Sequence, residues 1–286
     1  MSGSGTSNAV LWVYGDPGSG KSILCSHAIQ TIQETKPSAG VSFHFCQFDR
    51  FHSALETLRG LANTLFEQFW GRVGVSGTST GTAISASLPP LVEELRTKTA
   101  CSSSNEESIR DFLKVLIKGF DRTYILIDGL DEECEASRWP DFKIVLETLL
   151  PLVTSSEGSF RLWISSQDRA TLREEFKTFP SFDIKYCVSR DVELFLARRL
   201  NAEGEISREE LDSLLDHLKM RAEGNFLWAS MMIKMISEAS SMREMRRLVK
   251  DGPRNLDDYY RKIIMTIEKQ YRTLARYGFS YFFPPR

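Results

Sequence analysis

The stretch of this sequence with the clearest chemistry is Gly15-Asp16-Pro17-Gly18-Ser19-Gly20-Lys21-Ser22. Its glycines leave a backbone almost free of side chains, which can wrap a phosphate chain with main-chain N–H groups pointing inward. The spacing that ends in Gly-Lys-Ser is typical of such phosphate-binding loops. We expect Lys21 to reach the β- and γ-phosphates and Ser22 to offer its hydroxyl to Mg²⁺. The predicted nucleotide-binding residues here are Gly15, Asp16, Pro17, Gly18, Ser19, Gly20, Lys21, Ser22 and Ile23.

A second candidate group is acidic and follows the apolar run Tyr124–Asp128. An apolar strand that ends in Asp128 would place a carboxylate at the edge of a sheet, where it can hold a Mg²⁺-bound water. Asp131 and Glu132 come three and four residues later and could orient or deprotonate an attacking water. An acidic turn after a buried strand is the plainer alternative, and the phosphate loop earlier in the chain favours the catalytic interpretation.

A third group lies at the end of the run Phe160–Ser165. Ser165 or Ser166 could hydrogen-bond a γ-phosphate or a water, and Arg169 could pair with phosphate charge. On these residues alone, an ordinary surface loop is an equally good interpretation.

These groups need a scaffold, and the hydrophobic pattern predicts an α/β fold. Short apolar runs alternate with helical periodicity, which is typical of a three-layer fold with a parallel, here five-stranded, sheet. The predicted strands are Val10–Tyr14, Val41–Phe48, Tyr124–Asp128, Phe160–Ser165 and Phe182–Val188. Helices are predicted over about 21–34, 53–70, 90–99, 106–120 and 141–153 in this part, and over 190–202, 207–221, 225–239, 241–250 and 256–272 after it.

The same pattern divides the chain. Residues 1–8 are expected to be a flexible lead-in, and 9–188 an α/β domain with a loose Gly/Ser/Thr-rich loop near 71–88. Strand patterns stop near residue 188, so 189–272 is expected to be an all-helical subdomain.

Composition excludes several classes of protein. The formal net charge is −2, which gives no electrostatic case for a nucleic-acid or anionic-membrane partner. No apolar run is long enough to span a bilayer, and the first residues lack the pattern of a secretory signal. The 5 cysteines are widely spaced, as in reduced thiols of a cytoplasmic protein, and no metal-binding His/Cys cluster is present.

Further motifs narrow the class of phosphate-loop protein. The [NT]KxD motif with which GTPases read guanine is absent, as is the LSGGQ motif of ABC-type ATPases. A small-molecule kinase would usually be a short chain with an arginine-rich lid, whereas here a helical region follows the sheet.

Taken together, the motifs resemble the NACHT family of STAND P-loop NTPases, and more specifically fungal NOD-like receptor modules and the nephrocystin-3-like N-terminal NTPase domain. GDPGSGKS is similar to the Walker A loop of that family, and ILIDGLDE to its Walker B strand. The resemblance covers about residues 8–270. Four further stretches support it: FCQFD with ALETLRGL, LWISS, EGNFLWA and NLDDYY.

The resemblance implies a signalling switch in the cytoplasm. ATP or ADP (or another nucleotide such as GTP) with Mg²⁺ would bind at Gly15–Ser22, with Asp128 as the Walker B acid and Asp131 or Glu132 supporting slow hydrolysis. Exchange of diphosphate for triphosphate would move the domains and permit self-association. Full-length relatives are expected to carry effector and repeat domains, and 273–286 would begin a truncated winged helix.

The sequence departs from the family pattern at two places. Gln167 stands where the family often has arginine after the sensor strand, with Arg169 two positions later. Gly224-Asn225-Phe226 replaces a Gly-x-Pro turn that holds nucleotide in related proteins. Two alternatives therefore stay open: a module that binds nucleotide without hydrolysing it, and a P-loop kinase with an unknown acceptor.

Overall fold

A computed structural model of the chain describes residues 9–50, 52–75, 106–134, 137–156, 158–201 and 208–266. These residues form two compact units. One consists of residues up to Gly15 together with Lys21–Ile184, and the other of Asp16–Gly20 together with the chain from Lys185 onward. The predicted lead-in 1–8, the helix predicted over 90–99, most of the predicted loose loop and the region 273–286 lie outside the described residues.

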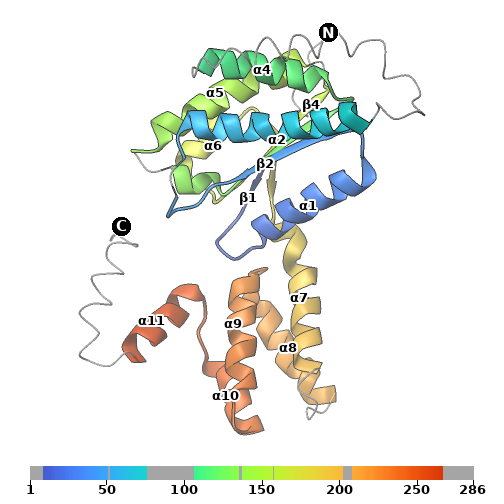
Figure 1. The fold of residues 1–286 in the computed structure, drawn as a ribbon. Helices are drawn as coiled ribbons and strands as arrows, with labels where there is room; N and C mark the ends of the chain where they lie inside the picture. The colour runs from blue at the N-terminus through green and yellow to red at the C-terminus, as the bar shows by residue number, and fades with distance from the viewer. Residues whose placement is uncertain are drawn as a thin grey trace, which may run out of the picture. The chain divides into compact units, whose positions relative to one another are not determined.

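The first unit is built on a parallel sheet of five strands in the order β2-β3-β4-β1-β5, which confirms the predicted fold class. Figure 1 shows the sheet between helices. The carboxyl ends of β3, β4 and β1 are neighbours, so the residues that follow these strands meet at one edge. The strands are β1 (Val10–Tyr14), β2 (Gly40–Phe45), β3 (Thr123–Asp128), β4 (Phe160–Ser166) and β5 (Ser181–Asp183).

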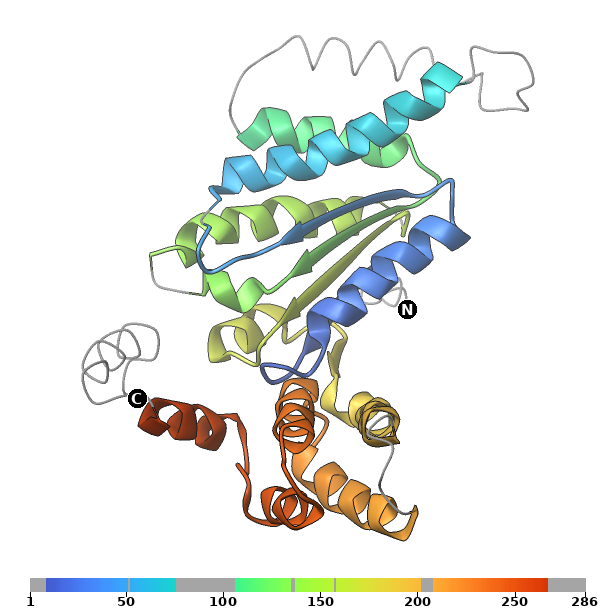
Figure 2. The same ribbon diagram turned by 60° about the horizontal axis from the view of Figure 1, so that its bottom comes forward.

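Helices cover both faces of this sheet, as Figures 1 and 2 show. Helix α1 (Lys21–Thr35) packs on one face, where Cys25 and Ile29 are buried with Leu126 of β3. The opposite face carries the larger core. It is covered by α2 (Ala54–Val75), α4 (Glu106–Lys118) and α5 (Trp139–Ser155).

The central strands are apolar on both faces because both faces are covered. Ile125, Leu126 and Ile127 of β3 are all buried, which is the pattern of an internal parallel strand. Helix α4 instead has one apolar side, with Leu113 and Leu116 fully buried. Burial of a leucine side chain stabilises a fold by about 2 kcal/mol, so these positions anchor the layers around the strand ends.

The edge strand β2 is protected by a side chain. Gln68 of α2 accepts a hydrogen bond from the Val41 N–H at 3.0 Å and donates to the Val41 carbonyl, so it satisfies main-chain groups that an edge strand leaves open. One turn later, Arg72 donates to the carbonyl oxygens of Pro37, Ser38 and Ala39. These bonds hold α2 in place beyond its predicted end at residue 70, so the helix runs to Val75.

Other predicted boundaries differ more. The fifth strand ends at Asp183, and residues from Lys185 form the first turns of α7, so the predicted strand over 182–188 was wrong from Ile184 onward. Two short elements were not predicted: the 3₁₀ helix η2 (Leu130–Glu133) and α6 (Ala170–Phe176). Both elements follow strands closely, and both are too short for a helical hydrophobic period to be recognised in the sequence.

From Lys185 onward, the secondary structure of the second unit is helical in the described residues. Its own core includes Leu196, Leu218, Trp228 and Met232. Arg221 donates to the carbonyl oxygens of Val249, in the last turn of α10, and of Gly252, directly after this helix. Its helices are α7 (Lys185–Asn201), α8 (Arg208–Ala222), α9 (Phe226–Ser237), α10 (Met242–Asp251) and α11 (Leu256–Thr266).

Helix α9 begins at a defined cap. The Asn225 side chain accepts a hydrogen bond from the Trp228 N–H at 2.9 Å, and Gly224 before it has φ 79°, a conformation that glycine adopts without strain. The Gly-Asn-Phe motif therefore has a structural role in starting this helix. No helix among the described residues has the length and apolar character needed to cross a membrane.

Candidate functional site: the carboxyl edge of the sheet

The glycine-rich loop joins β1 to α1, as its pattern predicts. Gly18 and Gly20 have φ 80° and 93°, values that other residues rarely adopt, which explains glycine at both positions. The Ser19 N–H donates to the Asp16 carbonyl at 3.2 Å and tightens the turn. Helix α1 begins at Lys21, so its first N–H groups are available to an anion at its N-terminus.

Both ends of the loop are tied down within the first unit. The Lys21 ammonium donates to the Gly15 carbonyl at 2.7 Å. The Gly15 N–H donates to the main-chain oxygen of Ser166, the last residue of β4, at 3.3 Å. The loop therefore starts beside the end of the strand that was predicted to sense phosphate.

Asp128 ends β3 and is almost completely buried, with 4% of its surface exposed. The Ser165 hydroxyl of the neighbouring strand β4 donates a hydrogen bond to its Oδ1 atom. Cys25 of α1 is close enough for the charge of Asp128 to act on it. Burial, and then this charge, raise the pKa of the Cys25 thiol to about 12.

The chain turns sharply after Asp128. Gly129 has φ 76°, and a Cβ atom at this position would lie 3.2 Å from the Cys46 carbonyl oxygen. The Cys46 N–H in turn donates to the Asp128 carbonyl at 2.9 Å. Glycine directly after the strand is thus required both by the backbone conformation and by the close approach of the segment after β2.

The turn brings η2 against the end of β4. The main-chain N–H of Gln167 donates to Oδ1 of Asp131 at 2.7 Å, so this carboxylate is fixed to the strand end. Glu132 is half-buried, and its pKa is raised from 4.5, first by burial and then by the charge of Asp131. The charge of Arg169 acts in the opposite direction on Glu132, which places the arginine near η2.

Cysteines surround this acidic turn. Burial raises the pKa of Cys46 well above its usual value, and the charges of Glu133, Asp128, Asp131 and Glu132 add to the effect. Burial, and then the charges of Asp131 and Glu133, raise the pKa of Cys134 to about 11. Both side chains therefore stay as neutral thiols and not as thiolate nucleophiles.

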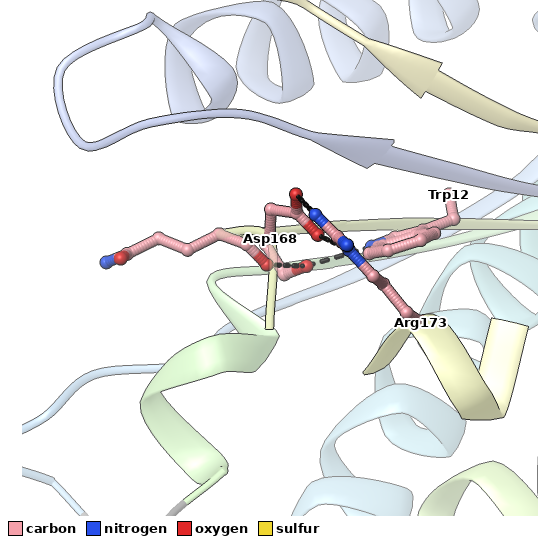
Figure 3. A network of polar contacts seen from close by, with 5 residues as sticks. Trp12, Asp168 and Arg173 are labelled. Carbon is pink, nitrogen blue, oxygen red and sulfur yellow. Dashed lines mark hydrogen bonds and ion pairs between the residues drawn. The ribbon is translucent and has the colours of Figure 1, made fainter. Parts of the chain in front are cut away.

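Ser166 faces the other side of the sheet from Ser165. Its hydroxyl accepts a hydrogen bond from the Trp12 indole N–H at 2.8 Å and donates to the Gln167 carbonyl at 2.8 Å (Figure 3). The hydroxyl donor is thus already used inside the protein. Beyond the strand, Asp168 forms an ion pair with Arg173 of α6, also drawn in Figure 3.

The structure brings some of the predicted site residues together at the edge of the sheet and leaves others exposed. Asp128 and Asp131 lie at one edge: Ser165 of β4 contacts Asp128 directly, and Gln167, the residue after β4, holds Asp131. Ile23 is 76% exposed, and Arg169 is an exposed residue at the start of α6. Sequence reasoning missed Trp12 and the main-chain N–H of Gln167. Strand alternation could have assigned Ser165 and Ser166 to opposite faces.

The residues at this edge suit Mg²⁺ by the chemistry of their donors. Mg²⁺ prefers oxygen ligands and is usually held by one or two protein groups together with phosphates and waters. Asp128 offers a carboxylate, and Ser22 offers a hydroxyl one turn before Cys25. The described residues contain no group of three or more His, Cys, Asp or Glu side chains that could hold a metal ion by themselves.

A protein of known name is similar in sequence to most of this chain. Vegetative incompatibility protein HET-E-1 of Podospora anserina is 25% identical over 287 residues, which cover 92% of this chain and 19% of that protein. The chain thus spans about a fifth of the length of this relative.

Solved structures are similar at a greater distance. The Aeropyrum pernix ORC2 protein, in its ADPNP-ADP complexes, gives a TM-score of 0.45 at 15% identity, over 87% of this chain and 63% of that one. A DNA replication initiation factor gives a TM-score of 0.43 at 14% identity, over 94% of this chain and 70% of that chain.

The family model is the decisive comparison. The model described as nephrocystin 3, N-terminal matches residues 1–167, more than half of the chain. This match takes in the glycine-rich loop, the Asp128 turn and all of β4, and it confirms the resemblance found in the motifs. The chain belongs to the nephrocystin 3 N-terminal family.

Proposed function

We propose that this chain is a nucleotide-operated signalling switch that binds ATP, or another nucleoside triphosphate, with Mg²⁺ at the carboxyl edge of its sheet. Gly15–Ser22 would cradle the phosphates, with Lys21 on the β- and γ-phosphates. Ser22 and Asp128 would hold Mg²⁺, which when bound neutralises phosphate charge.

One observation carries the proposal. The glycine-rich loop and the buried Asp128 carboxylate follow strands separated only by β4, and β4 contacts both: Ser166 accepts from Gly15, and Ser165 donates to Asp128. Ligands of open α/β sheets bind at this kind of edge, outside the carboxyl ends of the strands.

Slow hydrolysis is the second part of the proposal. Glu132 is the acid that we expect to activate water, because Asp131 already accepts a hydrogen bond from Gln167. A carboxyl with a raised pKa is a better proton acceptor, and this is the direction of the shift at Glu132. Hydrolysis would return the switch to its diphosphate state.

A binding module without turnover is the alternative that a specific observation favours. Arg169 lies near Glu132, where it offsets negative charge in the acidic turn. An arginine occupied in this way would not stabilise a departing phosphate. Single-turnover measurements separate the two cases, since only a hydrolysing switch releases inorganic phosphate from bound triphosphate.

The switch would act in the cytoplasm as part of a longer receptor. Cys25, Cys46, Cys134 and Cys187 are free thiols in the described chain, which suits a reducing compartment. In the proposed cycle, triphosphate favours a conformation that self-associates, because a ligand shifts a population by its differential affinity for two states.

The experiment that tests the proposal has two parts. Nucleotide is extracted from purified protein and identified, and the mass in solution is then measured with diphosphate and with triphosphate plus Mg²⁺. We expect bound adenine nucleotide and a larger mass with triphosphate. Protein that neither carries nor takes up any nucleotide would contradict the proposal.

A further inference from the structure

The end of strand β4 holds the two acids next to it by different means. Ile127 of β3 lies opposite Ile164 of β4 in the parallel register, so the next residues, Asp128 and Ser165, are neighbours on the same face. This is the face packed against α1. The Ser165 side chain has no exposed surface, and its hydroxyl donates to Oδ1 of Asp128.

This contact matters because Asp128 is buried. A buried carboxylate needs hydrogen-bond donors to replace the water that it has lost and to keep one orientation. A serine hydroxyl on Oδ1 supplies a donor and restricts the rotation of the carboxylate. A carboxylate that is held through one oxygen can offer its other oxygen to a metal ion without losing that hydrogen bond.

The next contact comes from the main chain directly after β4. Gln167 uses its N–H to hold Asp131, and any residue other than proline could make this bond. The glutamine side chain at the position where relatives often have arginine therefore has no part in this contact. Ser165 is the residue at this strand end whose side chain acts on an acid.

We propose that Ser165 is a positioning residue, which orients the Asp128 carboxylate toward a Mg²⁺ ion bound together with nucleotide phosphate. This inference rests on the proposed function. It differs from the expectation that Ser165 contacts phosphate or water, because here the hydroxyl acts only through Asp128.

The test compares Ser165→Ala with Ser42→Ala. Ser42 is also a fully buried serine in a strand of this sheet. Its hydroxyl donates to the main-chain carbonyl of Leu61 at 3.1 Å and not to an acid, so its removal serves as a control. Binding of a fluorescent ATP analogue is titrated at increasing Mg²⁺ and also in EDTA. Thermal melting of each variant monitors the fold.

We expect Ser165→Ala to raise the Mg²⁺ concentration that gives half-maximal binding of the ATP analogue about tenfold. This is the effect expected when a hydrogen bond to a charged group is lost. Affinity in EDTA should stay at the level of the unaltered chain, and Ser42→Ala should keep the original Mg²⁺ dependence. Ser165→Thr should restore most of the loss because it keeps the hydroxyl. If Ser165→Ala does not fold, Ser165→Cys, which has a weaker donor, should show the same change.

A second comparison separates positioning from packing. In an Asp128→Asn background, Ser165→Ala should leave the remaining Mg²⁺ dependence unchanged, since the group through which it acts is gone. An additive effect in that background, or an unchanged Mg²⁺ dependence in Ser165→Ala alone, would overturn the inference while nucleotide binding itself remained. Absence of nucleotide binding by the unaltered chain would overturn the proposed function and this inference together.

Discussion

The main-chain N–H of Gln167 lies 2.7 Å from Oδ1 of Asp131, so the acidic turn after β3 is fixed to the end of β4. Because the donor belongs to the backbone, only the acceptor can be removed without altering the main chain. This gives a clean way to separate the structural part of Asp131 from its charge.

Two substitutions of Asp131 should therefore differ. Asp131→Asn keeps an oxygen that can accept from Gln167 and should change stability little. Asp131→Ala leaves the N–H without its acceptor and should lower the free energy of unfolding by about 1–2 kcal/mol. Urea unfolding of both variants measures this difference, and equal stabilities would show that the bond does not support the turn.

Removing the loop lysine should weaken nucleotide binding. Lys21→Ala deletes a positive charge expected on the β- and γ-phosphates, so the Kd for ATP should rise about 10- to 100-fold. The control is Lys36→Ala, at the exposed end of α1, where the ammonium donates to the Tyr124 hydroxyl at 2.8 Å. Equal affinities of the two variants would rule out the expected role of Lys21.

Glu132 should set the acid side of the pH–rate profile. Its pKa is raised from 4.5, so as pH falls the carboxylate takes up a proton earlier than an ordinary glutamate. If the ionised form activates water, single-turnover hydrolysis should be half-lost at a pH above 4.5. Glu132→Gln should slow hydrolysis at least about 100-fold while nucleotide binding persists.

The matched control for this prediction is Glu174→Gln, an exposed glutamate on α6. It should keep both the rate and the profile. An acid limb at or below the ordinary glutamate range, or a normal rate in Glu132→Gln, would assign the proton transfer to another group.

His44 should make stability depend on pH. Burial, and then the charge of His52, lower the pKa of His44 from 6.5 to about 4 in the folded protein. Between these values the unfolded chain binds the proton more readily, so the free energy of unfolding should fall as pH falls from 6.5 to 4. The expected loss from this residue is about 3 kcal/mol.

Chemical unfolding at a series of pH values checks this. His44→Gln should remove this part of the acid loss, whereas His27→Gln, at an exposed position on α1, should keep it. The same slope in His44→Gln as in the unaltered protein would show that other groups cause the acid sensitivity.

The sequence predicted the sheet well because parallel strands buried on both faces are apolar throughout. Its boundaries failed where contacts distant in sequence decide them. Arg72 extends α2 by bonding to the turn before β2, which no local pattern in residues 71–75 reveals. The short α6 is fixed by the Asp168–Arg173 pair and by Leu172 and Phe176 in the core, and periodicity over seven residues is too weak to indicate it.

The types of residue in the candidate site could be predicted from the sequence, but their hydrogen-bond partners could not. The loop and Asp128 could be found because glycine spacing and a terminal carboxylate leave a pattern. Which serine faces Asp128 depends on the register between β3 and β4. The bond from the Gln167 backbone to Asp131 leaves no pattern in the sequence at all, because a main-chain donor is common to nearly every residue.

The central claim is that Mg²⁺-nucleotide binds at this edge of the sheet. Equilibrium titration of the unaltered chain with a fluorescent ATP analogue and Mg²⁺ tests it most directly, with Asp128→Asn measured beside it. We predict saturable binding that tightens with Mg²⁺ in the unaltered chain, and a much weaker Mg²⁺ dependence in Asp128→Asn. Binding that does not saturate, or one that is equally sensitive to Mg²⁺ in both proteins, would contradict it.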